Sequence, residues 1–357
     1  MSNYYPAQRH TLEMTTIQRE QSLPEDAIGQ VEARQGQSVN LRDIVAKGRL
    51  PSRFVIVDAA QFFKLRKPEE LTELLHVEIG SLVAPNDVMA SRKNRKLYSP
   101  IVGFVADIDG GRIIVQESPE TVELEAGLDG QVIQVRPGRG AVIETSASVV
   151  QGAWGNNRRV IGSLKVEPEA GLESLFGENL DIQYRGSILV TRRSLRDTGL
   201  QVLEDQSLAG VIAPSMEADL IDRVMRLKSA VMLTEGFGAF RMNVAAFNLL
   251  TQYNGRQATL DTAQPTRWAG RYPEVIINPS GRGSGRAPRP NTDMTLEVGT
   301  NVRLTRLPNA GTVGKVVNLP KSPFLLENGL RVLCAEVETI TGERLMVPLA
   351  NLEVFGR

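Results

Sequence analysis

Residues 36–46 read GQSVNLRDIVA, and residues 80–90 read GSLVAPNDVMA. The two stretches share a glycine, a valine, an aspartate, two apolar residues and an alanine at equal spacing. These positions are Gly36, Val39, Asp43, Ile44, Val45 and Ala46 in the first stretch and Gly80, Val83, Asp87, Val88, Met89 and Ala90 in the second. Repetition of a unit too small to bury its own apolar face predicts one supersecondary structure used twice. We expect stacked β-hairpins, with the two copies packed together.

The sequence around these copies predicts further strands. RFVIVDAAQFF at residues 53–63 is an apolar strand followed by a turn or short helix, and PEELTELL at residues 68–75 is a helix that begins at proline. Apolar alternation and glycine turns continue through residues 97–116, 127–135 and 140–145. We therefore predict a β-rich module over residues 29–164.

A set of positions in the second copy and just after it follows a known pattern: Gly80, Val83, Asp87, Ala90, Ser99, Pro100, Gly103 and Val105. This pattern resembles the barrel-sandwich hybrid fold of biotinyl and lipoyl carrier domains, adaptor proteins and inserts in RNA polymerase. Carrier domains hold their modified lysine between methionines or beside an acidic residue, whereas Lys96, the nearest candidate, lacks that setting. The resemblance therefore implies a scaffold, and we expect no cofactor.

Residues 165–278 change character. Short apolar strands alternate with helical stretches: strands at 187–191, 210–214, 231–235 and 274–278, and helices at about 193–206, 216–228 and 240–253. That alternation predicts a small central α/β domain with parallel strands. Ser215 is the expected N-cap of the middle helix.

Residues 279–295 form a linker or an exposed loop, because glycine, proline and serine there cannot bury apolar area. Arg282, Arg286 and Arg289 have no nearby acid before Asp293, so one hypothesis is contact with a phosphate or nucleic-acid backbone. The alternative is a soluble tether, which we favour.

VGTNVRLTRLPNAGTVGKVVNLP at residues 298–320 places Gly299, Val302, Arg303, Leu304, Pro308, Gly311, Gly314 and Val316 at regular positions. This spacing resembles the KOW motif of ribosomal proteins and transcription elongation factors. The resemblance implies a five-stranded KOW-type barrel over residues 296–357 that contacts RNA or proteins. Candidate nucleic-acid contacts in it are Arg303, Arg306 and Lys315.

The composition is that of a folded protein without a strong overall charge. Lys plus Arg and Asp plus Glu are each 41, so no whole-molecule field favours nucleic acid or an anionic membrane. Zero net charge also does little to keep copies apart, which favours self-association. Cys334 lies in an apolar run and reads as a buried, inert thiol.

The first 28 residues are polar and rich in glutamine, which predicts a flexible arm or one ordered only by a partner. They contain no apolar core of signal-peptide length, and no later stretch is long and apolar enough to insert into a membrane. We expect a cytoplasmic protein.

VMLTEGFGAFRMNVAAF at residues 231–247 has a strand, a glycine-rich turn and then a helix. That order can aim backbone amides at an anion, but the lysine and hydroxyl residue of a P-loop are missing. Gly236, Phe237, Gly238 and Phe240 are therefore a candidate anion or partner contact, and packing or partner contact is the favoured interpretation.

No catalytic, cofactor or metal residue is predicted. The only histidines are His10 and His76, so a histidine-based triad or metal site is hard to build. Three basic clusters remain, and they would bind nucleic acid if they converged on one face: Arg92, Lys93, Arg95 and Lys96; Arg158 and Arg159; Arg192, Arg193 and Arg196.

The sequence thus predicts a multidomain α+β protein: a β-rich barrel-sandwich-like module, a small α/β domain and a C-terminal barrel. The favoured function is a non-enzymatic scaffold or adaptor that presents several binding faces to protein partners or to itself in an oligomeric assembly. The alternative is a nucleic-acid-associated factor of transcription or translation that acts through the barrel and the arginine-rich linker. An enzyme of the central domain is the third hypothesis.

Overall fold

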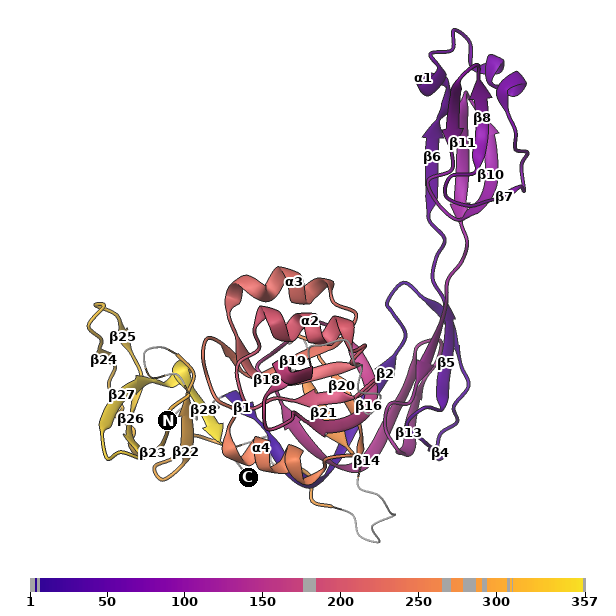
Figure 1. The fold of residues 1–357 in the computed structure, drawn as a ribbon. Coiled ribbons are helices and arrows are strands. Elements are labelled where there is room, and N and C mark those ends of the chain that lie inside the picture. Colours follow the sequence, from indigo (N-terminus) through magenta and orange to yellow (C-terminus); the bar gives the residue numbers. More distant parts are fainter. Residues whose placement is uncertain are drawn as a thin grey trace. The chain divides into compact units, whose positions relative to one another are not determined.

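The computed structural model describes residues 4, 7–175, 184–264, 271–278, 287–290, 294–306, 309 and 311–355. The chain is mostly β and forms two compact units (Figure 1). Unit 1 comprises residues 1–18, 127–130 and 144–357, and unit 2 comprises residues 19–126 and 131–143. No helix in the described ranges is long and apolar enough to cross a membrane.

The two repeated stretches adopt the same conformation in unit 2. Each copy has a short strand, a turn and a longer strand: β4 (Ser38–Val39) with β5 (Ile44–Arg49), and β7 (Leu82–Val83) with β8 (Val88–Arg92). Gly36 and Gly80 have φ angles of 83° and 92°, a region that only glycine adopts without strain. Their amides donate to equivalent carbonyls, Val132 at 2.8 Å and Val105 at 2.7 Å.

The aspartate that both copies share closes the turn in each copy. The carboxylate of Asp43 accepts from the amide of Asn40 at 2.7 Å, and that of Asp87 accepts from the amide of Ala84 at 2.8 Å. The predicted duplication is therefore confirmed down to individual hydrogen bonds.

The expectation that the copies pack together is wrong, because each copy is completed by different strands. In copy one, β5 belongs to the sheet β12 (Thr121–Glu125), β5, β3 (Ile28–Val31), and β4 belongs to the 11-stranded sheet. In copy two, β7 belongs to the sheet β6 (Phe54–Asp58), β11 (Arg112–Glu117), β10 (Gly103–Asp109), β7, and β8 belongs to a separate hairpin. Their apolar cores are separate. β5 pairs with β12, so everything between these strands, including copy two, is an insertion into copy one.

The remaining elements of unit 2 cover copy two or extend copy one. β8 forms a hairpin with β9 (Arg95–Tyr98), and α1 (Ala59–Phe63) and the 3-10 helix η1 (Pro68–Leu74) contribute Phe63 and Leu71 to the core. The expected helix after Pro68 is therefore present as a 3-10 helix. β13 (Gly130–Arg136) and β14 (Gly140–Gln151) follow in the larger sheet.

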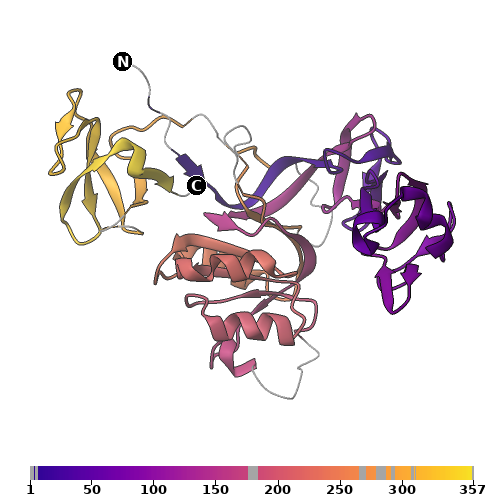
Figure 2. The ribbon, with the colours of Figure 1, turned by 90° about the horizontal axis from the view of Figure 1, so that it is seen from above.

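The N-terminal segment is not a flexible arm over its described residues. It forms β1 (Ala7–Arg9) and the long β2 (Thr11–Ser22), which lies alongside β14 (Figure 2). The polar composition predicted a flexible arm, but this strand buries polar side chains that have hydrogen-bond partners. The hydroxyls of Thr15 and Thr16 donate to the carbonyls of Pro288 and Ala287 at 2.8 and 2.5 Å.

The central domain has the predicted parallel sheet with helices on both faces. Its parallel strands are β16 (Arg159–Val166), β17 (Ile188–Val190), β18 (Gly210–Met216) and β19 (Ala230–Phe237). Antiparallel strands extend it: β20 (Gln257–Asp261), β21 (Glu274–Ile277) and β14 on one side and β15 (Trp154–Gly155) on the other. The expected boundary at residue 164 therefore falls inside β16.

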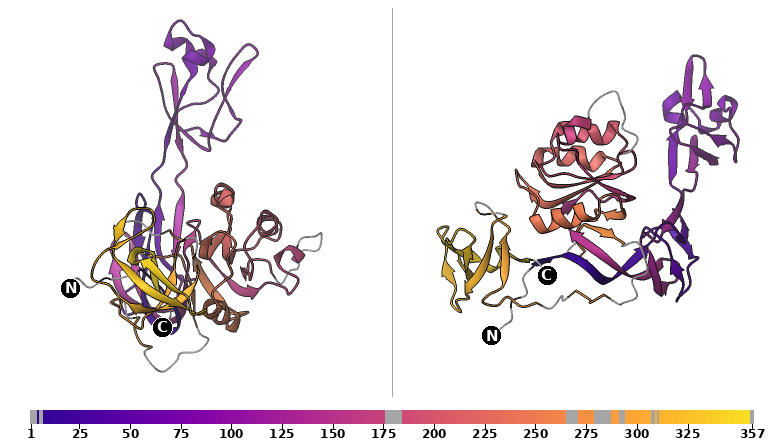
Figure 3. Two further views of the ribbon diagram at one scale, coloured as in Figure 1. Left: turned by 90° about the vertical axis from the view of Figure 1, so that its left-hand side faces the viewer. Right: turned by 60° about the horizontal axis from the view of Figure 1, so that its bottom comes forward.

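The three predicted helices are present: α2 (Asp197–Asp205), α3 (Ile221–Arg226) and α4 (Val244–Gln252). α2 and α3 lie on one face of the sheet and α4 on the other (Figures 1 and 3). Short 3-10 helices, η2 (Leu172–Leu175) and η3 (Ala218–Leu220), accompany them. Ser215 is not a helix N-cap as expected, because it lies fully buried within β18.

The C-terminal residues form the expected five-stranded antiparallel sheet, in the order β28, β22, β23, β26, β27. Its strands are β22 (Asn301–Leu304), β23 (Val313–Asn318), β26 (Cys334–Thr339), β27 (Arg344–Pro348) and β28 (Leu352–Phe355). β24 (Phe324–Leu325) and β25 (Arg331–Val332) form a side hairpin, and η4 (Leu349–Asn351) precedes β28. β1 adds a sixth strand, parallel to β28. Burial raises the pKa of the Cys334 thiol, in keeping with an inert core cysteine.

We predict that Asp43→Ala and Asp87→Ala each lower the free energy of unfolding by about 1 kcal/mol, because each leaves a turn amide without its side-chain acceptor. Asn at either position keeps an acceptor oxygen and should cost less. Chemical denaturation of the four variants measures this. Equal losses in the two copies are expected, and a loss at only one copy would contradict their equivalence.

Candidate functional site

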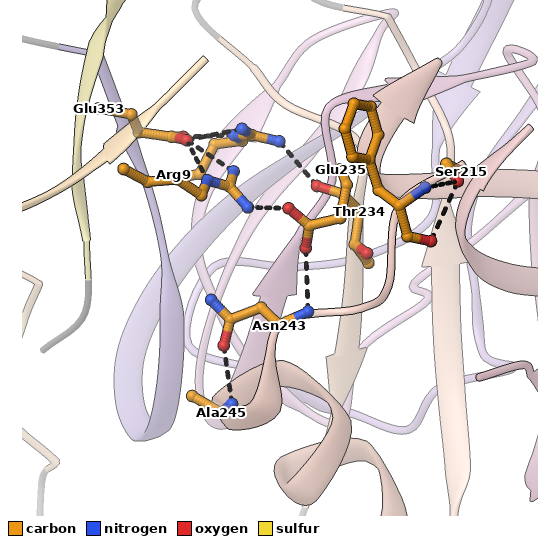
Figure 4. A network of polar contacts seen from close by, with 9 residues as sticks. Arg9, Ser215, Thr234, Glu235, Asn243, Ala245 and Glu353 are labelled. Atoms are coloured by element: carbon orange, nitrogen blue, oxygen red, sulfur yellow. Dashed lines mark hydrogen bonds and ion pairs between the residues drawn. The ribbon is translucent and has the colours of Figure 1, made fainter. Parts of the chain in front are cut away.

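Four charged side chains meet inside unit 1, where β1, the end of β19 and the C-terminal sheet come together (Figure 4). They are Arg9 of β1, Glu235 of β19, Arg303 of β22 and Glu353 of β28. The side chains of Glu235, Arg303 and Glu353 are 7%, 7% and 3% exposed, and that of Arg9 is 12% exposed. We call these four residues the ion cluster.

Glu353 is the centre of the ion cluster because it accepts from both arginines. Arg9 Nη2 and Arg303 Nη2 each lie 2.6 Å from Glu353 Oε2, and Arg303 Nε lies 3.1 Å from the same oxygen. Arg9 Nε donates to the other carboxylate oxygen. Both guanidinium groups are thus held by one acidic side chain.

Glu235 connects the cluster to the central domain. It accepts from Arg303 Nη1 and, at 3.1 Å, from the amide of Asn243. The side chain of Asn243 in turn caps α4 by accepting from the amide of Ala245 at 2.7 Å. Arg9 Nη1 donates to the carbonyl of Thr234 at 2.7 Å. The cluster therefore fixes β1, β19, α4 and the C-terminal sheet to one another.

Two cavities flank the ion cluster. One, of about 750 Å³, is lined by aromatic side chains of the central domain, Trp154, Phe237, Phe240 and Tyr272, and by Arg306 of the C-terminal module. Trp154 and Phe237 meet edge to face, with 5.4 Å between ring centroids. The other, of about 760 Å³, is lined by exposed Val244 and Ile340 and by Arg241. Both can accept apolar groups of a partner.

Burial raises the pKa of Tyr272, which lines the first cavity, and the nearby Glu353 carboxylate raises it further while Arg9 opposes this. The phenol is therefore held neutral and can act as a hydrogen-bond donor at neutral pH.

The glycine turn predicted as a candidate anion or partner contact lies beside the ion cluster. Gly236, Phe237 and Phe240 line the first cavity. Two amides of the turn are occupied, since Gly238 donates to the carbonyl of Met216 at 2.9 Å and Phe240 to the hydroxyl of Ser215 at 3.0 Å. Gly238 has a φ of 125°, and a Cβ there would lie 3.0 Å from the ring of Phe240, which is a tight contact. Gly238 and Phe240 therefore pack closely within the turn.

The described candidate nucleic-acid residues differ in their surroundings. Arg303 is buried in the ion cluster, and Arg289 pairs with Glu144 at 3.1 Å. Arg306 and Lys315 are exposed. Arg282 and Arg286 lie outside the described residues. Residues 287–290 of the predicted linker are hydrogen-bonded along β2, through the amide of Thr16 and the carbonyl of Pro288.

Several basic side chains of the three clusters have structural partners. In unit 2, Arg92 donates to the carbonyl of Phe63, and Arg95 lies over the ring of Phe62 at 4.7 Å. In unit 1, Arg192 lies over the ring of Phe247 at 5.5 Å, and Arg158 donates to the carbonyl of Leu227. These contacts give Arg92, Arg95, Arg158 and Arg192 structural roles, because each holds its side chain against a neighbouring element.

A buried carboxylate lies at the carboxyl end of the parallel strands. Glu167 follows β16 directly and accepts from the amide of Arg192 at 2.7 Å. Burial raises the pKa of Glu167, and the hydrogen bond from Arg192 opposes that rise. No group of three or more metal-binding side chains occurs in the described ranges.

Sequence reasoning missed Arg9 and Glu353. Arg9 lies in the polar segment expected to be flexible, and Glu353 interrupts the apolar strand LEVF. An acid in an otherwise apolar strand is a usable signal, because buried acids need a basic partner. The sequence does not say which of the many arginines supplies it.

No protein-family model matches this chain, and no curated protein matches it. The geometry of the site is therefore the basis for any functional conclusion.

We predict that Glu353→Ala lowers the free energy of unfolding by about 3–5 kcal/mol, because it leaves two buried guanidinium groups without their shared acceptor. Arg344→Ala in the same module is the control. Its side chain is 61% exposed and pairs weakly with Glu336 and Glu338, so at most about 1 kcal/mol should be lost. Thermal and urea unfolding measure both, and equal losses would contradict the central role of Glu353.

We predict that Glu167→Gln stabilises the fold at pH 7 and that this gain disappears towards pH ~4. Because the pKa of Glu167 is raised in the fold, protonated Glu167 contributes stability at pH values below the ordinary glutamate pKa. That contribution is lost as pH rises through the raised value. Gln keeps the acceptor for Arg192 without a charge. Glu169→Gln, at an exposed position, is the matched control for removal of a carboxylate in the same unfolding measurements.

Proposed function

We propose that the protein is a non-enzymatic scaffold or adaptor that presents several rigid binding faces in an oligomeric assembly. The single observation that carries this proposal is the ion cluster. Its four charged groups join three parts of unit 1, which are β1, the central domain and the C-terminal sheet. All four groups are paired with one another or with the backbone. A cluster of this kind holds surfaces in a fixed arrangement.

The cavities beside the cluster support the same proposal. Their walls come from two modules and are mostly apolar and aromatic, with Arg241 and Arg306 exposed at the margins. Aromatic and arginine side chains are enriched where proteins bind one another. The five-stranded C-terminal sheet fits a KOW-type barrel used for protein contact, and the repeated turns of unit 2 fit a barrel-sandwich hybrid used as a platform.

The nucleic-acid alternative has one observation in its favour. Arg306 and Lys315 are exposed on the C-terminal module, and neither is used by the ion cluster. In this alternative, both side chains would reach a phosphate backbone.

We predict that thermal-shift screening of the purified protein against nucleotides and other phosphorylated ligands shows no change in Tm. Sedimentation equilibrium should show a mass above the monomer value of 39.1 kDa that rises with concentration.

A ligand-induced shift in Tm that is lost in Arg241→Ala would instead support an enzyme or ligand-binding site. Binding of single-stranded RNA that falls steeply with salt, with a smaller salt slope in Arg306→Ala and Lys315→Ala, would favour the alternative.

A further inference from the structure

The four-stranded sheet of unit 2 has an apolar outer face. In the strand register, Phe54 of β6 and Phe104 of β10 both oppose Gln116 of β11, and Leu82 of β7 opposes Phe104. Directly opposed residues point to the same side of a sheet, so these side chains form one row. Ile56 and Ile114 form the next row.

This row is not the core of unit 2. The alternating residues Val83, Val105, Ile113 and Val115 are at most 1% exposed and fill the core on the opposite side of the sheet. Leu82, Ile56 and Phe54 are 77%, 60% and 59% exposed.

A strand with apolar residues on both sides is typical of a sheet whose two faces are both covered. Antiparallel sheets with one face in water alternate apolar and polar residues instead. The runs FVIV at residues 54–57 and IIV at residues 113–115 break that alternation. Nothing in the described part of the chain covers the outer side chains, as their exposure shows. The composition of these strands thus points to a cover supplied by another molecule.

We propose that a second copy of this chain covers this surface, with the two outer faces packed sheet on sheet about a two-fold axis. Two apolar sheet faces pack against each other in this way in β-sandwiches. The apolar rows contain one polar side chain, Gln116, and one charged side chain, Asp107, which opposes Ile114 on the part of β10 that β7 does not pair with. Their other side chains offer little to a nucleic acid or a charged ligand. The inference rests on the proposed scaffold function and names its partner.

The area and charge of the face fit a dimer of copies. The three most exposed side chains, Leu82, Ile56 and Phe54, leave roughly 300 Å² of apolar surface in water, within the range of the main patch of a typical monomer. A standard interface buries about 800 Å² per partner, of which the apolar core is part. The chain has no net charge to drive copies apart.

The charged end of the same face sets the orientation. Arg112 opposes Asp58 on β6 and Asp109 on β10, and Asp107 opposes Ile114. A two-fold axis through the apolar rows puts the two charged ends on opposite sides of the interface. Like charges then stay in water and apart.

Sedimentation equilibrium of the full chain over about 1–100 µM tests the proposal. The wild type should reach twice the monomer mass of 39.1 kDa. Ile56→Lys and Leu82→Lys, on opposite edges of the sheet, should each raise the dimer Kd at least about tenfold, because each buries an unpaired charge. Both positions are exposed within one copy, and far-UV circular dichroism verifies the fold.

Matched controls are Ile28→Lys, in the other sheet of unit 2, and Leu325→Lys, on the β24–β25 hairpin. These residues are 81% and 55% exposed, and the dimer should persist in both variants. A wild type that stays monomeric overturns the inference together with the oligomeric part of the proposed function. A dimer that persists in both Ile56→Lys and Leu82→Lys, or is lost in either control, overturns the inference alone.

Discussion

Glu353 can remain buried only because two guanidinium groups reach it from different parts of the chain. A buried carboxylate without partners would cost several kcal/mol, so the ion cluster exists only when β1, β19, β22 and β28 are all in place. The cluster therefore makes the arrangement of unit 1 cooperative. The N-terminal strand is part of that arrangement, since Arg9 supplies one of the two positive charges.

The cluster also explains the use of the glycine turn after β19. Glu235 holds the amide of Asn243, and Asn243 caps α4, so the turn and the helix are fixed by the same carboxylate that meets Arg303. The amides of Gly238 and Phe240 in this turn are occupied, and the side chains of Phe237 and Phe240 form walls of the first cavity.

Much of the fold followed from local patterns in the sequence. The glycine and aspartate positions of the repeat each have a local role, a left-handed backbone at Gly36 and Gly80 and a turn acceptor at Asp43 and Asp87, so spacing alone identified them. The alternation of strands and helices gave the central parallel sheet for the same reason. The nesting of the second copy inside the first was not predictable, because it depends on β5 pairing with β12 across the insertion.

The sequence by itself determined which short elements form and where glycine, aspartate and apolar residues must lie within them, because those requirements act over a few neighbouring residues. Only the tertiary structure decided that Arg9 and Arg303 share Glu353, that Arg289 pairs with Glu144, and that Phe54 and Ile56 remain uncovered within one copy. Charge pairing and burial join residues hundreds of positions apart. Which residues pair and which are buried depends on which strands become neighbours, and the local sequence pattern does not determine the neighbours of a strand.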